Sequence, residues 1–130
     1  MAACPDDIIW VCGLAEVWAP PLYAVGARGF TSGLINVWPE HSVAIHTALD
    51  AGNYPEANRL TAQMRAFEDV RAEEYNGTNV TGVKAALMAI GHNCGPTRPP
   101  SAWPLTQNQQ RTLDAFIKAN KLIELQETKS

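Results

Sequence analysis

The segment from Gly29 to Gly33, with the sequence Gly-Phe-Thr-Ser-Gly, offers two hydroxyl groups and two glycines shortly before a predicted helix. Backbone N–H groups at the start of a helix attract phosphate or carboxylate, so the segment is a candidate anion cradle, although it contains no lysine. The other interpretation is a strand end entering an N-cap, in which Thr31 and Ser32 only help to start the helix. Ser32 could also donate its hydroxyl to an oxygen of a sugar acid.

Nucleophilic and metal-binding side chains form no comparable group. A lysine that attacks a carbonyl group must be desolvated or otherwise activated. Solvated roles are instead expected for the four lysines of the chain: Lys84, Lys118, Lys121 and Lys129. His41 and His46 are five residues apart, which does not align two ligands on one helix face as a spacing of four would. No carboxylate completes a zinc site beside them, so we expect neither a metal nor another cofactor.

Composition narrows the class of protein. The 130 residues carry a net charge of −3, with 46% hydrophobic and 18% charged residues, which indicates a globular chain that binds neither nucleic acid nor a membrane. No apolar stretch is long enough to cross a bilayer. The cysteines Cys4, Cys12 and Cys94 have no ligand or redox spacing, and the N-terminus has no secretory signal. Reduced thiols and a cytoplasmic location are therefore predicted.

Short apolar runs alternate with helical patterns in the first fifty residues. The run Ile8–Cys12 is typical of a strand covered on both faces, and Gly29–Ser32 predicts a second strand. Leu14–Val25 has apolar residues at helical spacing, and a further helix is expected to begin at Pro39 and to end near Ala51. This order is typical of parallel α/β architecture, but two strands alone make a poor sheet.

The second half of the chain predicts only helices. A long helix is expected from Pro55 to about Glu74, and the next helix would bury Val80, Val83, Leu87 and Ile90. The proline-rich stretch from Gly95 to Pro104 cannot be helical. Thr106 and Gln109 have the spacing of a capping box that opens a last helix, whose inward residues are expected to be Leu113, Phe116 and Ile117. The polar tail after Lys121 is expected to fray.

Five strings, in this order along the chain, resemble the dihydrodipicolinate synthase/N-acetylneuraminate lyase family. Val11–Gly13 is similar to the end of the family's seventh strand, and Val25–Glu40 to the region of its seventh helix and eighth strand. Ala51–Ala57, Asn79–Leu87 and Gly95–Pro100, the last reading G-P-T-R-P-P, resemble landmarks of its C-terminal helices. The resemblance covers nearly the whole chain.

The resemblance implies an α/β fold that is only part of a barrel. The family has a TIM (β/α)8 barrel followed by a three-helix extension, and a complete barrel alone requires roughly 250 residues. Residues 1–52 would then be the last two βα units of an incomplete TIM barrel, and residues 53–130 the helical C-terminal extension. The partner of this chain would be a missing N-terminal barrel portion or further copies of the chain in a homo-oligomer.

The family's chemistry, by resemblance, is that of a Schiff-base-forming lyase, an aldolase or a dehydratase, which acts on a 2-keto acid or keto-sugar acid. The family's catalytic lysine and tyrosine lie on strands upstream of Met1, so no catalytic residue is assigned here, and the isolated chain should be inactive and form no pyruvate adduct. The substrate-binding candidates are the strand-end residues Gly13, Glu16, Thr31, Ser32 and Gly33. Thr31 matches a position near the bound keto acid, and Gly13 one near the distal part of the substrate.

Other functions stay open from the sequence. The chain could be a non-catalytic remnant that serves as a helical oligomerisation or interaction module, or an unrelated small α/β binding protein. Within the family, the sequence of Gly29–Gly33 resembles that of the sugar-acid dehydratases more than that of the lysine-biosynthetic enzymes.

Overall fold

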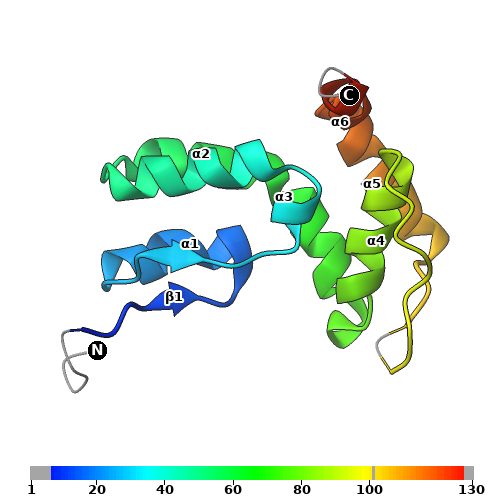
Figure 1. Cartoon of the computed structure of the whole chain (residues 1–130), viewed down its shortest axis with the longest axis horizontal. Helices are drawn as coiled ribbons and strands as arrows, with labels where there is room; N and C mark the ends of the chain where they lie inside the picture. The colour runs from blue at the N-terminus through cyan, green and yellow to red at the C-terminus, as the bar shows by residue number, and fades with distance from the viewer. Residues whose placement is uncertain (1–6, 101, 128–130) are drawn as a thin grey trace.

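A computed structural model describes residues 7–100 and 102–127 of the chain (Figure 1). The elements follow the order β1 (Val11–Cys12), α1 (Ala15–Ala24), β2 (Gly29–Phe30), the 3-10 helix η1 (Leu34–Asn36), α2 (Pro39–Asp50), α3 (Tyr54–Asn76), α4 (Asn79–Ala89), α5 (Gln107–Ala119) and α6 (Leu122–Glu127). The predicted order of two strand–helix units followed by helices is confirmed. Figure 1 places β1 and α6 at opposite ends of the molecule, with α3 between them.

The two strands form a short parallel pair. Val11 is paired with Gly29 and Cys12 with Phe30, and α1 makes the crossover between the strands. Both strands are shorter than predicted. The prediction that the first strand is covered on both faces is wrong within the described residues. Cys12 is buried, but Val11 is 53% exposed and Ile9 is 75% exposed, because no described element packs against their side of the pair.

Helix α3 organises the core. It contacts α1 and α2 on one side and α4 and α5 on the other. The predicted apolar stripe of α3 is confirmed, since its buried side chains are Ala57, Leu60, Met64, Phe67 and Val70. One buried cluster includes residues from before and after position 52, so the βα part and the helical part pack on a shared core. The division at residue 52 stays a prediction about how the chain relates to a barrel.

The buried face of α4 agrees with the predicted one at Ile90 and differs from it elsewhere. Gly82, Ala86 and Ile90 are buried, whereas Val80 is 42% exposed and Val83 is half-buried. The small residue Gly82 permits close packing on α3, because a Cβ at this position would lie 3.2 Å from Cγ of Arg71. The apolar side chains of Val80, Val83 and Leu87 line a cavity instead.

The C-terminal part contains one confirmed and one incorrect prediction. Thr106 and Gln109 form both hydrogen bonds of the capping box, and α5 buries the three predicted apolar side chains. The tail after Lys121 was expected to fray, but residues Leu122–Glu127 form α6. Leu122 is only 1% exposed, and burial of this single apolar side chain holds the start of α6 on the core.

No helix in residues 7–100 and 102–127 is both long and apolar enough to span a bilayer. Of the three cysteines, Cys12 is free and buried, and Cys94 is free and exposed. Cys4 lies outside the described residues.

Candidate functional site

A cavity of about 760 Å³ lies between the strand ends and the helical part. Four of the five predicted site residues line it: Gly13 after β1, and Thr31, Ser32 and Gly33 after β2. They meet because β1 and β2 are parallel, so that both carboxyl ends open on the same side. The opposite wall comes from α3 and α4, which contribute polar residues such as Glu68 and Arg71 and the apolar Val80, Val83 and Leu87.

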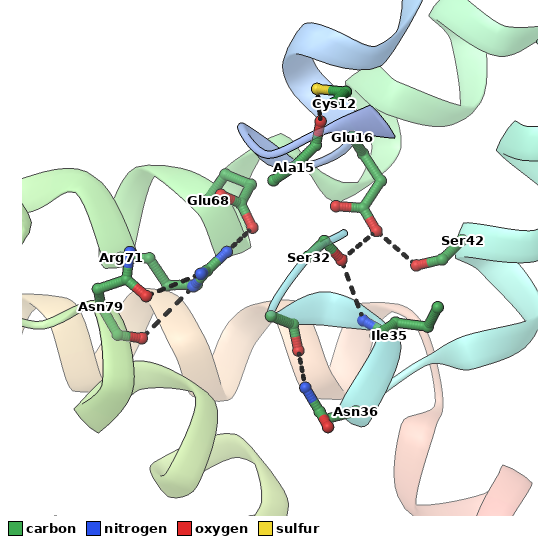
Figure 2. A network of polar contacts seen from close by, with 11 residues as sticks. Cys12, Ala15, Glu16, Ser32, Ile35, Asn36, Ser42, Glu68, Arg71 and Asn79 are labelled. Atoms are coloured by element: carbon green, nitrogen blue, oxygen red, sulfur yellow. Dashed lines mark hydrogen bonds and ion pairs between the residues drawn. The ribbon is translucent and has the colours of Figure 1, made fainter. Parts of the chain in front are cut away.

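Glu16, the fifth predicted residue, does not line the cavity. Its side chain in the first turn of α1 is fully buried. Oε1 of Glu16 accepts hydrogen bonds from Oγ of Ser32 at 2.6 Å and from Oγ of Ser42 at 2.5 Å. Figure 2 shows the carboxylate between the two serines, one from the loop after β2 and one from α2. Glu16 thus contacts the wall of the cavity from behind.

The Ser32 hydroxyl both donates and accepts a hydrogen bond within the chain. It donates to Glu16 and accepts from the backbone N–H of Ile35 at 3.2 Å. A serine hydroxyl has one proton to donate, so in this arrangement Ser32 has none for a sugar-acid oxygen. The bond from Ile35 is the type of contact that the capping interpretation predicts.

Thr31 points into a different environment from that of Ser32. Its side chain is exposed and lines the cavity, while its backbone N–H donates to the carbonyl oxygen of Cys12 at 2.9 Å. The helix that follows this segment is η1, which has only three residues. A helix this short supplies little dipole, so the anion-cradle interpretation lacks the helix on which it depends.

The α3 side of the cavity carries a buried ion pair. Arg71 Nη1 donates to Glu68, and Arg71 Nη2 donates to Oδ1 of Asn79 at 2.8 Å (Figure 2). Burial raises the pKa of Glu68, and this effect outweighs the opposing attraction of Arg71, with Glu16 adding a smaller increase. A buried carboxylate held by a single guanidinium is therefore the most perturbed acidic group on the cavity wall.

Arg71 also fixes the residue type at position 33. A Cβ on Gly33 would lie 2.5 Å from Cζ of Arg71 and 2.6 Å from a methyl carbon of Val83. The loop after β2 therefore touches α3 directly. Sequence reasoning did not find Glu68 and Arg71, because they are adjacent to the apolar stripe of a helix and nothing local indicates that they face a glycine almost forty residues earlier.

Lys84 lies on the cavity wall but is not a free amine. Its Nζ donates to the carbonyl oxygens of Cys94, Gly95 and Pro96 at 3.2, 3.5 and 3.0 Å. Lys84 is thus only partly solvated, and it holds the proline-rich loop against α4. Lys118 and Lys121 are exposed as predicted, and Lys129 lies outside the described residues.

The two histidines on α2 serve separate contacts. His41 Nε2 donates to the carbonyl oxygen of Leu60 at 2.9 Å, and its ring stacks on Trp38 with centroids 4.0 Å apart. Burial lowers the pKa of His41. His46 Nδ1 is hydrogen-bonded to the Tyr23 hydroxyl at 2.8 Å. Within the described residues, no group of three histidine, cysteine or carboxylate side chains is arranged to hold a metal ion.

Comparisons with known proteins relate this geometry to enzymes. The model of the dihydrodipicolinate synthetase family matches residues 1–120. A probable 5-dehydro-4-deoxyglucarate dehydratase from Acinetobacter baumannii is 31% identical over 114 residues, which cover 86% of this chain and 37% of that protein. A 4-hydroxy-tetrahydrodipicolinate synthase from Methanopyrus kandleri is 35% identical over 96 residues, or 74% of this chain and 31% of that protein.

Solved structures agree on the fold. Dihydrodipicolinate synthase from Oceanobacillus iheyensis matches with a TM-score of 0.87 and 40% identity, over 93% of this chain and 41% of that one. The enzyme from Bacillus clausii matches with a TM-score of 0.82 and 34% identity, over 88% of this chain and 38% of that one. The chain spans less than half the length of each of these relatives. The predicted fold, the last βα units of a TIM barrel with a helical extension, is confirmed.

Proposed function

We propose, because this chain belongs to the dihydrodipicolinate synthetase family, that it is the C-terminal part of a Schiff-base-forming lyase, an aldolase or dehydratase that acts on a 2-keto acid or keto-sugar acid. The observation that carries the proposal is the cavity at the strand ends, where Gly13, Thr31, Ser32 and Gly33 come together. These four residues form one wall of the substrate site, with Glu16 buried behind it.

The lysine that forms the Schiff base comes from outside the described residues. A nucleophilic lysine must be held in a desolvated site or beside a group that lowers its pKa. Lys84 is engaged by three carbonyl oxygens of the proline-rich loop, and Lys118 and Lys121 are exposed and do not line the cavity at the strand ends. In the intact enzyme, a preceding barrel portion supplies the lysine and a helping tyrosine, and this chain closes the site.

The substrate class is best supported as a keto acid with a polar chain. The relatives from Acinetobacter baumannii and Xanthomonas campestris, with 31% and 30% identity, are probable 5-dehydro-4-deoxyglucarate dehydratases. The cavity wall combines the exposed hydroxyl of Thr31 with Asn36, Asn79 and the charged groups of α3. Such a wall suits the hydroxyl and carboxylate groups of a sugar acid better than a purely apolar substrate.

The test is a chimera. The segment of the Acinetobacter dehydratase that aligns with this chain is replaced by the corresponding residues of this chain, and the protein is incubated with pyruvate and then with borohydride. The chimera should gain the mass of a reduced pyruvate adduct on the lysine of the donor barrel and should dehydrate 5-dehydro-4-deoxyglucarate. The isolated chain, treated in the same way, should gain no mass.

Two outcomes would contradict the proposal. An adduct on Lys84, Lys118 or Lys121 of the isolated chain would overturn the assignment of the lysine to another segment. A chimera that folds with the circular dichroism of the parent, yet forms no adduct, would show that this chain does not complete a lyase site.

A second candidate function, a non-catalytic oligomerisation module, is favoured by the apolar side chains that the βα part leaves exposed. Ile9 is 75% exposed, Leu14 59% and Trp18 55%, and the strand pair has two open edges among the described residues. Unpaired strand edges and apolar faces promote association. The isolated chain should therefore be an oligomer in light scattering, and Ile9→Lys should shift it toward the monomer. A monomer that unfolds cooperatively would count against this module.

A further inference from the structure

We infer that Glu16 is a positioning residue, which fixes the Thr31–Gly33 loop in the cavity wall by holding the hydroxyl of Ser32. This role deepens the proposed function, on which its significance for substrate binding rests. The hydrogen-bond geometry that supports the role belongs to the chain itself and can be tested without activity.

The burial of Glu16 requires a specific reason. A carboxylate removed from water is costly unless hydrogen bonds compensate, and hydrogen bonds to an ionised group are shorter and stronger than neutral ones. Glu16 is fully buried, and its Oε1 receives both serine hydroxyls at 2.6 and 2.5 Å. Its Oε2 is buried and accepts no hydrogen bond from the described residues. The two serine hydroxyls therefore compensate the burial of the carboxylate, and the carboxylate in turn holds the hydroxyl of Ser32.

The two hydroxyl bonds join three elements. Glu16 lies in the first turn of α1, Ser32 follows β2, and Ser42 lies near the start of α2. Sequence neighbours cannot supply this contact, because Ser32 and Ser42 are 16 and 26 residues from Glu16. The carboxylate thus fixes the loop after β2 relative to the helices on both sides of it.

The other side of the loop is held by α3. Gly33 packs against the guanidinium of Arg71, which is itself held by Glu68 and Asn79. The loop is therefore fixed between a buried carboxylate on α1 and a buried guanidinium on α3 (Figure 2). Thr31, whose side chain faces the cavity, precedes the two fixed residues, so its position follows from theirs.

The amide of Ile35 reports on this arrangement. Its N–H donates to the same Ser32 oxygen whose proton goes to Glu16. When Glu16 no longer holds Ser32, the hydroxyl can rotate away and the Ile35 amide loses its acceptor. Hydrogen exchange at Ile35, measured by NMR or mass spectrometry on the full 130-residue chain, is therefore a local signal for a role of Glu16.

The variants are Glu16→Ala, Glu16→Gln, Ser32→Ala and, as the matched control, Ser42→Ala. Glu16→Ala and Ser32→Ala should each speed exchange at Ile35 by about tenfold, the factor expected for one hydrogen bond of ordinary net strength. Glu16→Gln keeps an acceptor but loses its charge, and should give a smaller increase. Ser42→Ala removes a hydroxyl from the same carboxylate oxygen without touching the loop, and should leave Ile35 within about twofold of the parent. Ser32→Thr restores a hydroxyl and should restore protection.

Two results would overturn the inference. One is unchanged exchange at Ile35 in both Glu16 variants, or in Glu16→Gln if Glu16→Ala does not fold. The other is an equal acceleration in Ser42→Ala and Ser32→Ala, which would reveal a general loss of stability instead of a local role.

The link to catalysis is tested in the chimera. Glu16→Gln should raise KM for the keto acid more than it lowers kcat, because a displaced wall weakens substrate and transition state alike. An equal or larger fall in kcat would reject the positioning role in binding. An unmodified chimera without any activity would contradict the proposed function, while the Ile35 measurement would still decide the role of Glu16.

Discussion

The two parts of the chain bury their apolar side chains to different extents. The βα part runs up to Asp50, and the helical part begins at Tyr54. The helical part surrounds α3, whose Met64 and Phe67 are fully buried. The βα part leaves Ile9, Val11 and Trp18 more than half exposed. The helical part is therefore packed around a buried helix, although Met88 and Trp103 are about half exposed, whereas the strand pair of the βα part presents the kind of surface that another protein segment covers.

The same contrast holds around the cavity. Its polar contacts are made within the chain, by Glu16 with two serines and by Arg71 with Glu68 and Asn79. Its apolar lining on α4, with Val83 and Leu87, is only half-buried. The site residues are thus fixed by this chain alone, while part of the surface around them stays open. In the proposed enzyme, a preceding barrel portion would therefore enclose the site without having to arrange its wall.

The largest effect is expected where the helical core is densest. Phe67→Ala should lower the free energy of unfolding by about 3–5 kcal/mol, since the ring is fully buried and packs on Phe116 with centroids 5.6 Å apart. Ile9→Ala, on the open side of β1, should change it by less than about 0.5 kcal/mol. Urea denaturation followed by circular dichroism measures both. Equal losses would mean that the βα part is packed as fully in solution as the helical part.

A smaller effect is expected where the two parts touch at Gly33. Gly33→Ala should cost about 1–3 kcal/mol, because the added methyl group would overlap the guanidinium of Arg71 and the side chain of Val83. Gly13→Ala is the matched control on the same cavity, since nothing lies within 4 Å of a Cβ there, and its effect should stay within about 0.5 kcal/mol.

A double variant tests whether Arg71 is the residue that causes the loss of stability in Gly33→Ala. If the overlap with Arg71 causes the loss, Gly33→Ala should cost less in an Arg71→Ala background, and the two free energies should not add. Additive losses, measured by the same urea titrations, would place the strain elsewhere in the loop.

Local patterns were sufficient to predict most of the helices. The stripe on α3 and the capping box of Thr106 and Gln109 depend on spacings of three and four residues, which any reader of the sequence can see. Of the predicted face of α4 only Ile90 is fully buried, because large side chains were preferred over Gly82, although the small residue permits the closer approach. Helix α6 was not predicted because the single apolar residue that holds it on the core, Leu122, lies in a polar tail.

Part of the site was predictable because it follows from a general rule about parallel strands. Parallel strands bring their carboxyl ends together, so Gly13 and Thr31–Gly33 could be grouped without a structure. The partners of Glu16 and the approach of Arg71 to Gly33 depend on three-dimensional packing across 16 to almost 40 residues, which no spacing rule reports. A resemblance supplied the place of Glu16 near the site, and only the structure shows that it lies behind the wall.

The smallest expected effect is on the pH dependence of stability, to which the βα part and the helical part contribute with opposite signs. Burial lowers the pKa of His41 on α2 below its ordinary value of 6.5, so the unfolded chain binds this proton more readily. The stability that depends on neutral His41 is present above pH 6.5 and is lost as the pH falls toward the folded pKa. Burial raises the pKa of Glu68 on α3 above 4.5, so here the folded chain binds the proton more tightly, and stability is lost as the pH rises from 4.5 through the folded pKa.

The two groups therefore give opposite slopes of unfolding free energy against pH between 4.5 and 6.5. His41→Gln can keep a donor to the carbonyl oxygen of Leu60 and should remove the loss of stability on acidification. The contribution of Glu68 then remains alone, so the free energy of unfolding should fall more steeply as the pH rises. Glu68→Gln should do the reverse, and each variant serves as the control for the other. Urea midpoints measured across this range decide the matter. A curve that is unchanged in His41→Gln would mean that the βα part opens enough to hydrate this ring, whereas an unchanged curve in Glu68→Gln would mean that water reaches the helical wall of the cavity.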